Sequence, residues 1–99
     1  MREADVTEVA AVESPVVIDV REPDEYRALR ASGVIHIPMG EVIERLDEIP
    51  TDDTVYVICA SGGRSARVAE YLEAQGIDAV NVAGGTNAWA QAGLPTEQG

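Results

Sequence analysis

Residues 55–66 read VYVICASGGRSA, an apolar run followed by a loop of small residues. The run Val55–Ile58 is rich in β-branched side chains, which is typical of a buried strand. Beyond the loop, apolar residues between positions 68 and 72 recur at helical spacing, and Gly76 ends the pattern as a helix C-cap does. The stretch therefore predicts a strand, a tight turn and a helix, with Cys59 at the carboxyl end of the strand.

Extended and helical patterns alternate along the rest of the chain. Apolar runs predict further strands at 16–20, 34–38 and 79–83. Helical signals predict a short helix from Pro23, an amphipathic helix over 40–49 and a final helix that carries Trp89. Residues 6–12 fit an edge strand or a helical turn, and residues 91–99 contain the segment most expected to be frayed. This alternation is typical of an α/β fold with a mostly parallel sheet, in which ligands bind beyond the carboxyl ends of the strands.

The length of 99 residues predicts one domain over residues 1–99. No apolar run approaches the ~20 residues that span a bilayer, and residues 1–5 show no apolar signal segment. The single cysteine excludes an internal disulfide and a multi-cysteine metal site, so we expect no metal. A free thiol without an export signal indicates a reducing, cytoplasmic setting.

The charge balance is strongly acidic. Eighteen acidic residues face seven basic ones, all arginine, for a net charge of −11. Nucleic acids and anionic membrane surfaces bind proteins through basic patches, so we expect neither as a partner.

The loop after Cys59 has the features of an anion cradle. Gly62 and Gly63 permit backbone conformations that let several N–H groups converge, and a helix N-terminus near Ser65 adds further donors. Arg64 adds a positive charge, and no Asp or Glu lies anywhere between positions 53 and 70. A cysteine there would have its thiolate favoured. The spacing alone equally fits a small core cysteine beside a Gly-Gly turn.

Other polar and aromatic candidates have simpler interpretations. His36 lies between two isoleucines and is expected to be structural rather than a catalytic base, and Trp89 is expected to anchor the core. The acidic residues Glu41, Glu44, Asp47 and Glu48 are expected to form a solvated surface.

Three segments together resemble the single-domain rhodaneses, a sulfurtransferase family. They are VIDVREPDEY at 17–26 followed by IHIP at 35–38, CASGGRSA at 59–66, and VAGGTNAW at 82–89 followed by GLP at 93–95. The resemblance covers about residues 16–95. It implies a three-layer α/β sandwich in which helices flank a five-stranded, mainly parallel sheet.

The resemblance also implies an enzyme of the thiosulfate sulfurtransferase type that needs no cofactor. Cys59 would take a sulfane sulfur from thiosulfate or a persulfide and pass it to a thiophilic acceptor, such as cyanide or a thiol, by double displacement. The substrate-binding residues would be Ala60, Ser61, Gly62, Gly63, Arg64 and Ser65.

Two departures from the family pattern bear on the donor and on a local turn. Ala60 stands where many thiosulfate-using members carry a basic residue, which favours a persulfide donor. Residues 29–33 lack the family's usual His-Pro turn.

Three other functions remain open at this stage. The first is a persulfide relay to an acceptor protein, for thiolation or cofactor synthesis, and the second is a non-catalytic binding module. The third is a cysteine-dependent phosphatase or arsenate reductase, which needs five residues between its cysteine and arginine. Here four residues separate Cys59 from Arg64.

Overall fold

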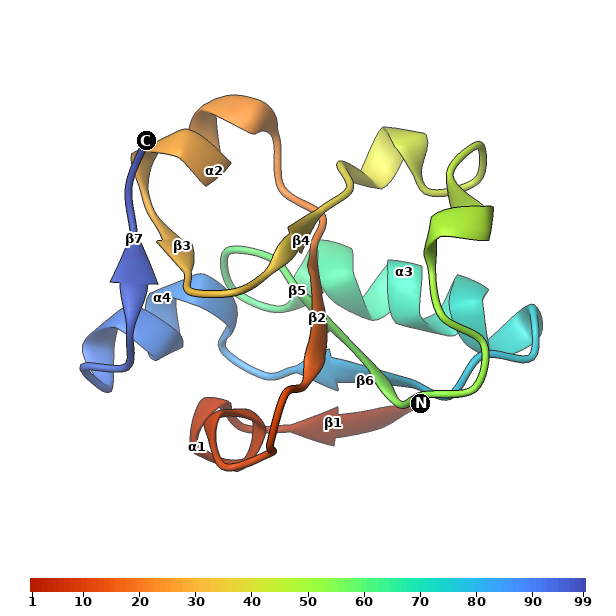
Figure 1. Ribbon diagram of the computed structural model, residues 1–99, viewed down its shortest axis with the longest axis horizontal. Coiled ribbons are helices and arrows are strands. Elements are labelled where there is room, and N and C mark those ends of the chain that lie inside the picture. Colours follow the sequence, from red (N-terminus) through yellow and green to blue (C-terminus); the bar gives the residue numbers. More distant parts are fainter.

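The computed structural model describes residues 1–99 and is built round a five-stranded sheet (Figure 1). All neighbouring strands are parallel, which confirms the predicted α/β class and the mainly parallel sheet. The strand order is β1 (Arg2–Ala4), β6 (Ala79–Val82), β5 (Val55–Ile58), β2 (Val16–Asp19) and β4 (Ile35–His36). A second, two-stranded sheet pairs β3 (Arg30–Ala31) with β7 (Thr96–Glu97) in antiparallel fashion.

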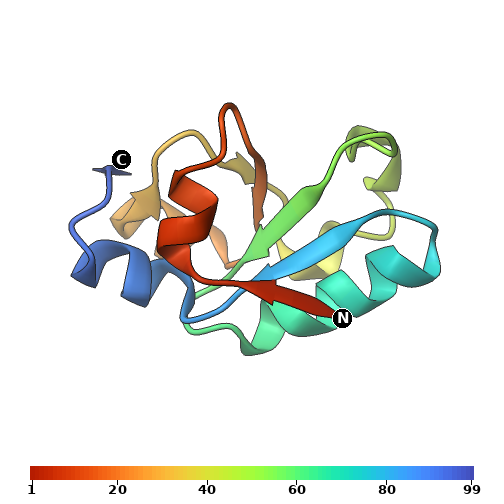
Figure 2. The ribbon, with the colours of Figure 1, turned by 90° about the horizontal axis from the view of Figure 1, so that it is seen from below.

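Helices cover both faces of the large sheet. Successive residues of a strand point to opposite faces, so one apolar strand contributes side chains to two cores. Val55, Val57 and Cys59 pack in a core beneath α3 (Gly63–Ala74), whereas Ile58 packs in a second core. That second core contains residues of α1 (Val6–Ala10) and α4 (Gly85–Gln91) and the buried Trp89. Figure 2 shows α1 and α3 on opposite sides of the sheet. The remaining α-helix, α2 (Pro23–Ala28), follows β2 and buries no side chain fully.

The amphipathic helix predicted over 40–49 is wrong. The chain there forms two 3₁₀ turns, η1 (Met39–Glu41) and η2 (Leu46–Glu48). A helix of at most ten residues between Gly40 and Pro50 is marginal by itself. The two turns bury Val42 and Ile49, and they leave Ile43 72% exposed. The acidic residues in this segment are exposed, as expected.

Both ends of the chain contain regular secondary structure. Residues 6–10 are helical, and Asp5 caps that helix by accepting a hydrogen bond from the Glu8 N–H at 2.9 Å. The edge strand lies before it, at Arg2–Ala4. At the C-terminus, β7 pairs with β3 and the Gly99 N–H donates to the Arg27 carbonyl at 2.8 Å, although residues 95–99 are exposed.

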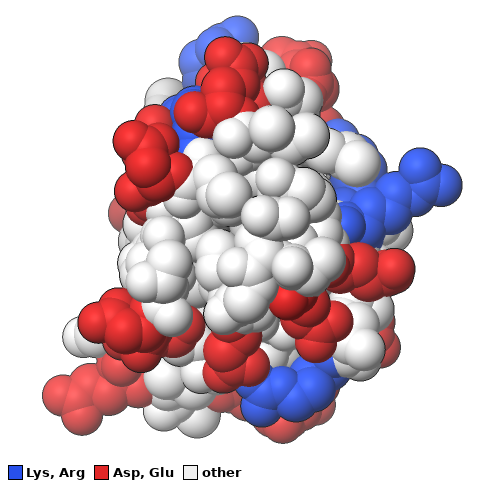
Figure 3. Space-filling view, turned by 90° about the vertical axis from the view of Figure 1, so that its right-hand side faces the viewer, with Lys and Arg blue, Asp and Glu red and all other residues white.

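The surface has an uncharged area on the side where η1 and η2 lie. Figure 3 views that side and shows this area bordered mainly by acidic side chains. Next to η1, α3 helps to frame a groove of about 200 Å³ lined by Met39, Val42, Ile43, Arg67, Val68 and Tyr71. None of these residues belongs to the loop after Cys59. No helix is both long enough and apolar enough to cross a membrane.

Candidate active site

Cys59 directly follows β5, at the carboxyl end of the sheet, and its sulfur faces the N-terminus of α3. The residue is 1% exposed. The Gly62 N–H donates to Sγ at 3.1 Å, and the Ser65 hydroxyl lies 3.2 Å from Sγ as a second donor. The predicted strand, loop and helix are thus present, with α3 beginning at Gly63, two residues before the expected start.

Gly85, the first residue of α4, lets the loop after Cys59 pack closely against that helix. Gly85 has φ +57° and packs so tightly that a Cβ there would lie 2.7 Å from the backbone C and O of Ala60. Immediately after it, the Thr86 N–H donates to the Cys59 carbonyl at 2.8 Å. The Asn87 N–H donates in the same way to the Ala60 carbonyl at 3.0 Å. These bonds hold the first two carbonyls of the loop against α4, where they cannot oppose negative charge on the sulfur.

Gly62 gives the loop its second turn. Its φ of +113° is a conformation that side-chain-bearing residues rarely adopt, and it places the N–H on the Cys59 sulfur. Of the other predicted site residues, Ser61 and Gly63 are exposed, whereas Ala60 and Arg64 are half-buried and Ser65 is fully buried. The loop therefore has an exposed outer rim and a buried floor that carries the thiol and the hydroxyl.

The environment favours the thiolate of Cys59. Burial raises the pKa of the thiol, but hydrogen bonds from the Ser65 hydroxyl and from backbone N–H groups outweigh burial, so the pKa lies below its ordinary value. The N–H groups belong to Ser65, Gly62 and Ser61. The first N–H groups of α3 have no acceptor inside the helix, which leaves them free to solvate an anion.

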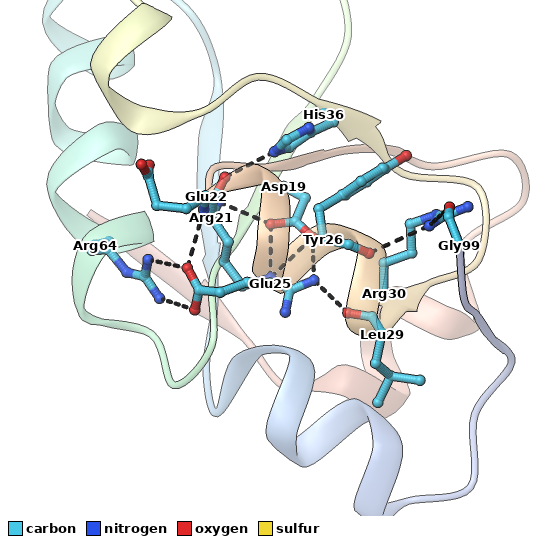
Figure 4. Close-up of polar contacts among 10 residues, drawn as sticks. All are labelled: Asp19, Arg21, Glu22, Glu25, Tyr26, Leu29, Arg30, His36, Arg64 and Gly99. Carbon is cyan, nitrogen blue, oxygen red and sulfur yellow. Dashed lines mark hydrogen bonds and ion pairs between the residues drawn. The ribbon is translucent and has the colours of Figure 1, made fainter.

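Arg64 is already engaged by a carboxylate (Figure 4). Its two terminal nitrogens donate to the two carboxylate oxygens of Glu25, at 2.8 and 3.0 Å. The Arg64 hydrogen bonds hold the pKa of Glu25 at about 2. The sequence indicated a positive charge free to hold an anion. In the structure Glu25 of α2 supplies the matching negative charge. It lies 39 positions away in the chain, so the sequence around Arg64 could not reveal it.

The rest of the first motif is structural. Asp19, fully buried, accepts three hydrogen bonds from the Arg21 side chain at 2.8 to 3.1 Å, and Arg21 also donates to the Leu29 carbonyl at 2.7 Å. His36 stacks on Tyr26 with ring centroids 4.1 Å apart, and its Nε2 lies 2.8 Å from the Arg21 carbonyl oxygen (Figure 4). The structure thus gives His36 the structural role expected of it.

Comparison with known proteins identifies the family. The Rhodanese-like domain family matches residues 5–92. The chain belongs to the rhodanese-like family. Over 88 residues it is 42% identical to YrkF of Bacillus subtilis, covering 88% of this chain but only about half (48%) of YrkF.

Two further relatives carry functional names. A sulfurtransferase of Allochromatium vinosum is 38% identical, with 88% of this chain and 82% of the relative covered. The thiosulfate sulfurtransferase GlpE of Actinobacillus succinogenes is 37% identical, with 86% and 78% covered. The solved structure of a rhodanese-related protein from Thermoplasma volcanium covers all of both chains with a TM-score of 0.93 and 32% identity. Together, the family and these names support sulfurtransferase activity.

Two residues of this rhodanese-like domain that contact the loop were missed by the sequence reasoning. Glu25 lies inside the first motif, but 39 positions from the arginine that it binds. Asn81 is 1% exposed and donates to the Gly62 carbonyl at 3.1 Å. A polar residue inside the apolar run 79–83 was a signal that could have identified it, because a buried amide needs partners. No group of three or more His, Cys, Asp or Glu side chains is placed to hold a metal ion.

Proposed function

We propose that Cys59 is the nucleophile of a sulfurtransferase that carries a sulfane sulfur as a cysteine persulfide. The observation that supports this role is the set of hydrogen-bond donors on its sulfur, the Gly62 N–H at 3.1 Å and the Ser65 hydroxyl at 3.2 Å. Preorganised donors of this kind stabilise charge on an attacking or leaving atom without reorganising during the reaction.

The reaction balances in two steps. In the first, the Cys59 thiolate attacks the outer sulfur of the donor, the donor's S–S bond breaks, and the remainder leaves with the electron pair as sulfite or a thiolate. In the second, cyanide or a thiolate attacks the outer sulfur of the Cys59 persulfide, and Cys59 leaves as the thiolate. Both steps place negative charge inside the loop. An acceptor protein that presents a thiolate would fit the second step in the same way.

The charges around the loop favour a persulfide over free thiosulfate as the donor. Glu25 neutralises Arg64, Ala60 adds no charge, and the chain carries a net charge of −11. A thiosulfate dianion would approach an acidic molecule without a free cation at the loop. The persulfide group carries one negative charge or none, so a donor with no other charged group meets less repulsion than thiosulfate.

The same ion pair argues against phosphatase or arsenate chemistry. Such chemistry needs an arginine that can close on a tetrahedral oxyanion, and both terminal nitrogens of Arg64 are bound to Glu25. Only four residues separate Cys59 from Arg64, so the ring of donors is also small. We expect no hydrolysis of a small aryl phosphate comparable to sulfur transfer.

Mass spectrometry of the intact protein tests the proposal. After exposure to glutathione persulfide or thiosulfate, the wild type should gain one sulfur atom, and cyanide should remove it with release of thiocyanate. Cys59→Ser should gain none and should keep its fold, because the change is small. Sulfur loading or thiocyanate formation in Cys59→Ser at the wild-type level would refute the role of Cys59.

A further inference from the structure

A chain of hydrogen bonds connects the edge strand β1 to the Cys59 sulfur. Asn81, in β6, donates from Nδ2 to a Glu3 carboxylate oxygen at 2.9 Å and to the Gly62 carbonyl at 3.1 Å. The Ser65 hydroxyl donates to Asn81 Oδ1 at 2.5 Å and lies 3.2 Å from the Cys59 sulfur. Glu3 stands beside Asn81 because β1 and β6 pair with these two residues in register.

The partners of Asn81 fix the orientation of its amide. A carboxylate and a carbonyl only accept hydrogen bonds, so the amide must turn its NH₂ group toward Glu3 and Gly62. Its oxygen therefore faces Ser65 and can only accept. Asn81 is 1% exposed and makes bonds from both ends of its amide, so a flip would turn its oxygen toward Glu3 and Gly62 and leave these two contacts without a proton.

Ser65 consequently has one proton and two acceptors for it. A hydroxyl donates a single hydrogen bond. The Asn81 oxygen and the Cys59 sulfur both lie within hydrogen-bond distance of the Ser65 oxygen, and the contact to Asn81 is the shorter one. When the sulfur carries no charge, the amide oxygen is the better acceptor. When the sulfur is a thiolate, the charge-assisted bond is roughly twice as strong as a neutral one, and the sulfur competes.

We propose that Asn81 is a positioning residue that controls the direction of the Ser65 hydroxyl. Its amide oxygen accepts the Ser65 hydrogen bond while Cys59 is neutral or carries a persulfide, and the hydroxyl turns to donate to the sulfur as thiolate charge forms there. The inference rests on the proposed function for its role in turnover. Cys59 leaves as a thiolate in the second step, so the donor would act when charge develops on that sulfur. The proton remains on the Ser65 oxygen throughout, and only the hydroxyl rotates.

The competition for the Ser65 hydroxyl predicts the direction in which the pKa of Cys59 changes when Asn81 is replaced. Replacing Asn81 with leucine keeps the branched shape of the side chain but removes the competing oxygen, so the Ser65 hydroxyl can donate to the thiolate without giving up another hydrogen bond. We expect Asn81→Leu to lower the Cys59 pKa by about half a unit to one unit, the range that one hydrogen bond supplies. The effect should depend on Ser65, because in Ser65→Ala no hydroxyl is left to release.

The experiment is a double-mutant cycle on thiol reactivity. The rate of Cys59 alkylation by iodoacetamide is measured against pH for the wild type, Asn81→Leu, Ser65→Ala and the double variant. The proposal expects the downward shift caused by Asn81→Leu to be at least half a unit larger with Ser65 present than with Ser65→Ala. An equal shift in both backgrounds, or an upward shift that appears only with Ser65 present, would show that Asn81 merely supports the loop and would overturn the proposal.

Two measures keep the test decisive. If Asn81→Leu does not fold, as judged by circular dichroism and Trp89 fluorescence, the same cycle is run with Asn81→Ala, which removes the same oxygen without adding bulk. Alkylation reports the thiol alone and needs no sulfur transfer. Failure of the wild type to form a persulfide would therefore refute the proposed function, whereas failure of the cycle would refute only the role of Asn81.

Discussion

The pairing of Glu25 with Arg64 predicts that one substitution will change the choice of donor. Glu25→Gln removes the negative charge but keeps an oxygen that can accept a hydrogen bond from the Glu22 N–H, now 3.0 Å from Glu25 Oε1. The start of α2 should therefore persist. Arg64 would be left with an unbalanced positive charge beside the loop, and an anionic donor would gain a partner.

The size of the effect follows from the ion pair. The pKa of Glu25 falls from its ordinary 4.5 to about 2, because Arg64 donates two hydrogen bonds to its carboxylate. Taken at face value this shift corresponds to about 3 kcal/mol, but the two side chains are 32% and 38% exposed. Solvent screening reduces the coupling to about 1–2 kcal/mol. A freed Arg64 that recovers about 1 kcal/mol on a thiosulfate ion would raise thiosulfate turnover roughly fivefold.

The assay compares two donors with one acceptor. Thiocyanate formation from cyanide is measured with thiosulfate and with 2-hydroxyethyl persulfide, whose only charge is that of the persulfide group, and kcat/KM is taken for each. Glu25→Gln should raise the ratio of thiosulfate to persulfide kcat/KM about fivefold. The matched control is Glu48→Gln, which also removes one acidic charge from an arginine pair, since Arg45 binds Glu48 at 2.9 Å on the exposed η2 turn.

Two results would refute this reasoning. If Glu48→Gln raised the ratio as much as Glu25→Gln, the change in net charge and not Arg64 would set donor choice. If Glu25→Gln folded normally but left the ratio unchanged, the neutralised arginine would have no part in excluding thiosulfate.

Three other outcomes can be measured. Gly85→Ala should lose about 2–4 kcal/mol in the free energy of unfolding, since a Cβ would overlap the Ala60 backbone. Gly93→Ala, with φ +71° and no atom within 4 Å of a Cβ, should lose only about 1–2 kcal/mol by denaturant unfolding. Because the pKa of Glu25 is depressed in the folded protein, its pair with Arg64 stabilises the fold above about pH 4.5, and this stabilisation is lost as the pH falls toward about 2. The difference in unfolding free energy between wild type and Glu25→Gln should therefore shrink over that interval. A constant difference would contradict the pairing. Thiosulfate turnover should rise with added salt, which screens repulsion by the net charge of −11, while turnover with an uncharged alkyl polysulfide should stay level; parallel salt curves would contradict the electrostatic argument.

The sequence was most informative where the deciding interactions are local. The apolar, β-branched run Val55–Ile58 and the glycines that follow indicate a strand and a turn within one short stretch, so the place of Cys59 at a strand end could be predicted. The segment 40–49 has helical spacing too, yet it forms two 3₁₀ turns. Periodicity identifies which residues can share a buried face, but the length between Gly40 and Pro50 and the packing of Val42 and Ile49 decide the backbone.

The polar contacts of the loop could not be predicted because they join distant positions. Arg64 meets Glu25 across 39 residues, and Asn81 meets Glu3 across 78. The second pair depends on strand order, since Glu3 reaches Asn81 only because β1 pairs with β6 at the edge of the sheet. The first pair joins α2 to α3. Counting charges along the chain therefore predicted an unpaired Arg64 side chain, whereas in the folded protein Glu25 binds it.

Because Glu25 binds Arg64, other groups must stabilise negative charge on the Cys59 sulfur. With Arg64 bound to Glu25, the groups that stabilise the Cys59 thiolate are uncharged: backbone N–H groups, of which that of Gly62 is 3.1 Å from the sulfur, and the Ser65 hydroxyl. Dipoles act only over short distances, so they can stabilise an atom held within about 3 Å but cannot draw a distant anion from solution. A site of this kind suits an intermediate whose charge forms on an atom already inside the loop, as on the inner sulfur of a persulfide. Binding a free dianion would instead require the long-range attraction that this acidic chain lacks.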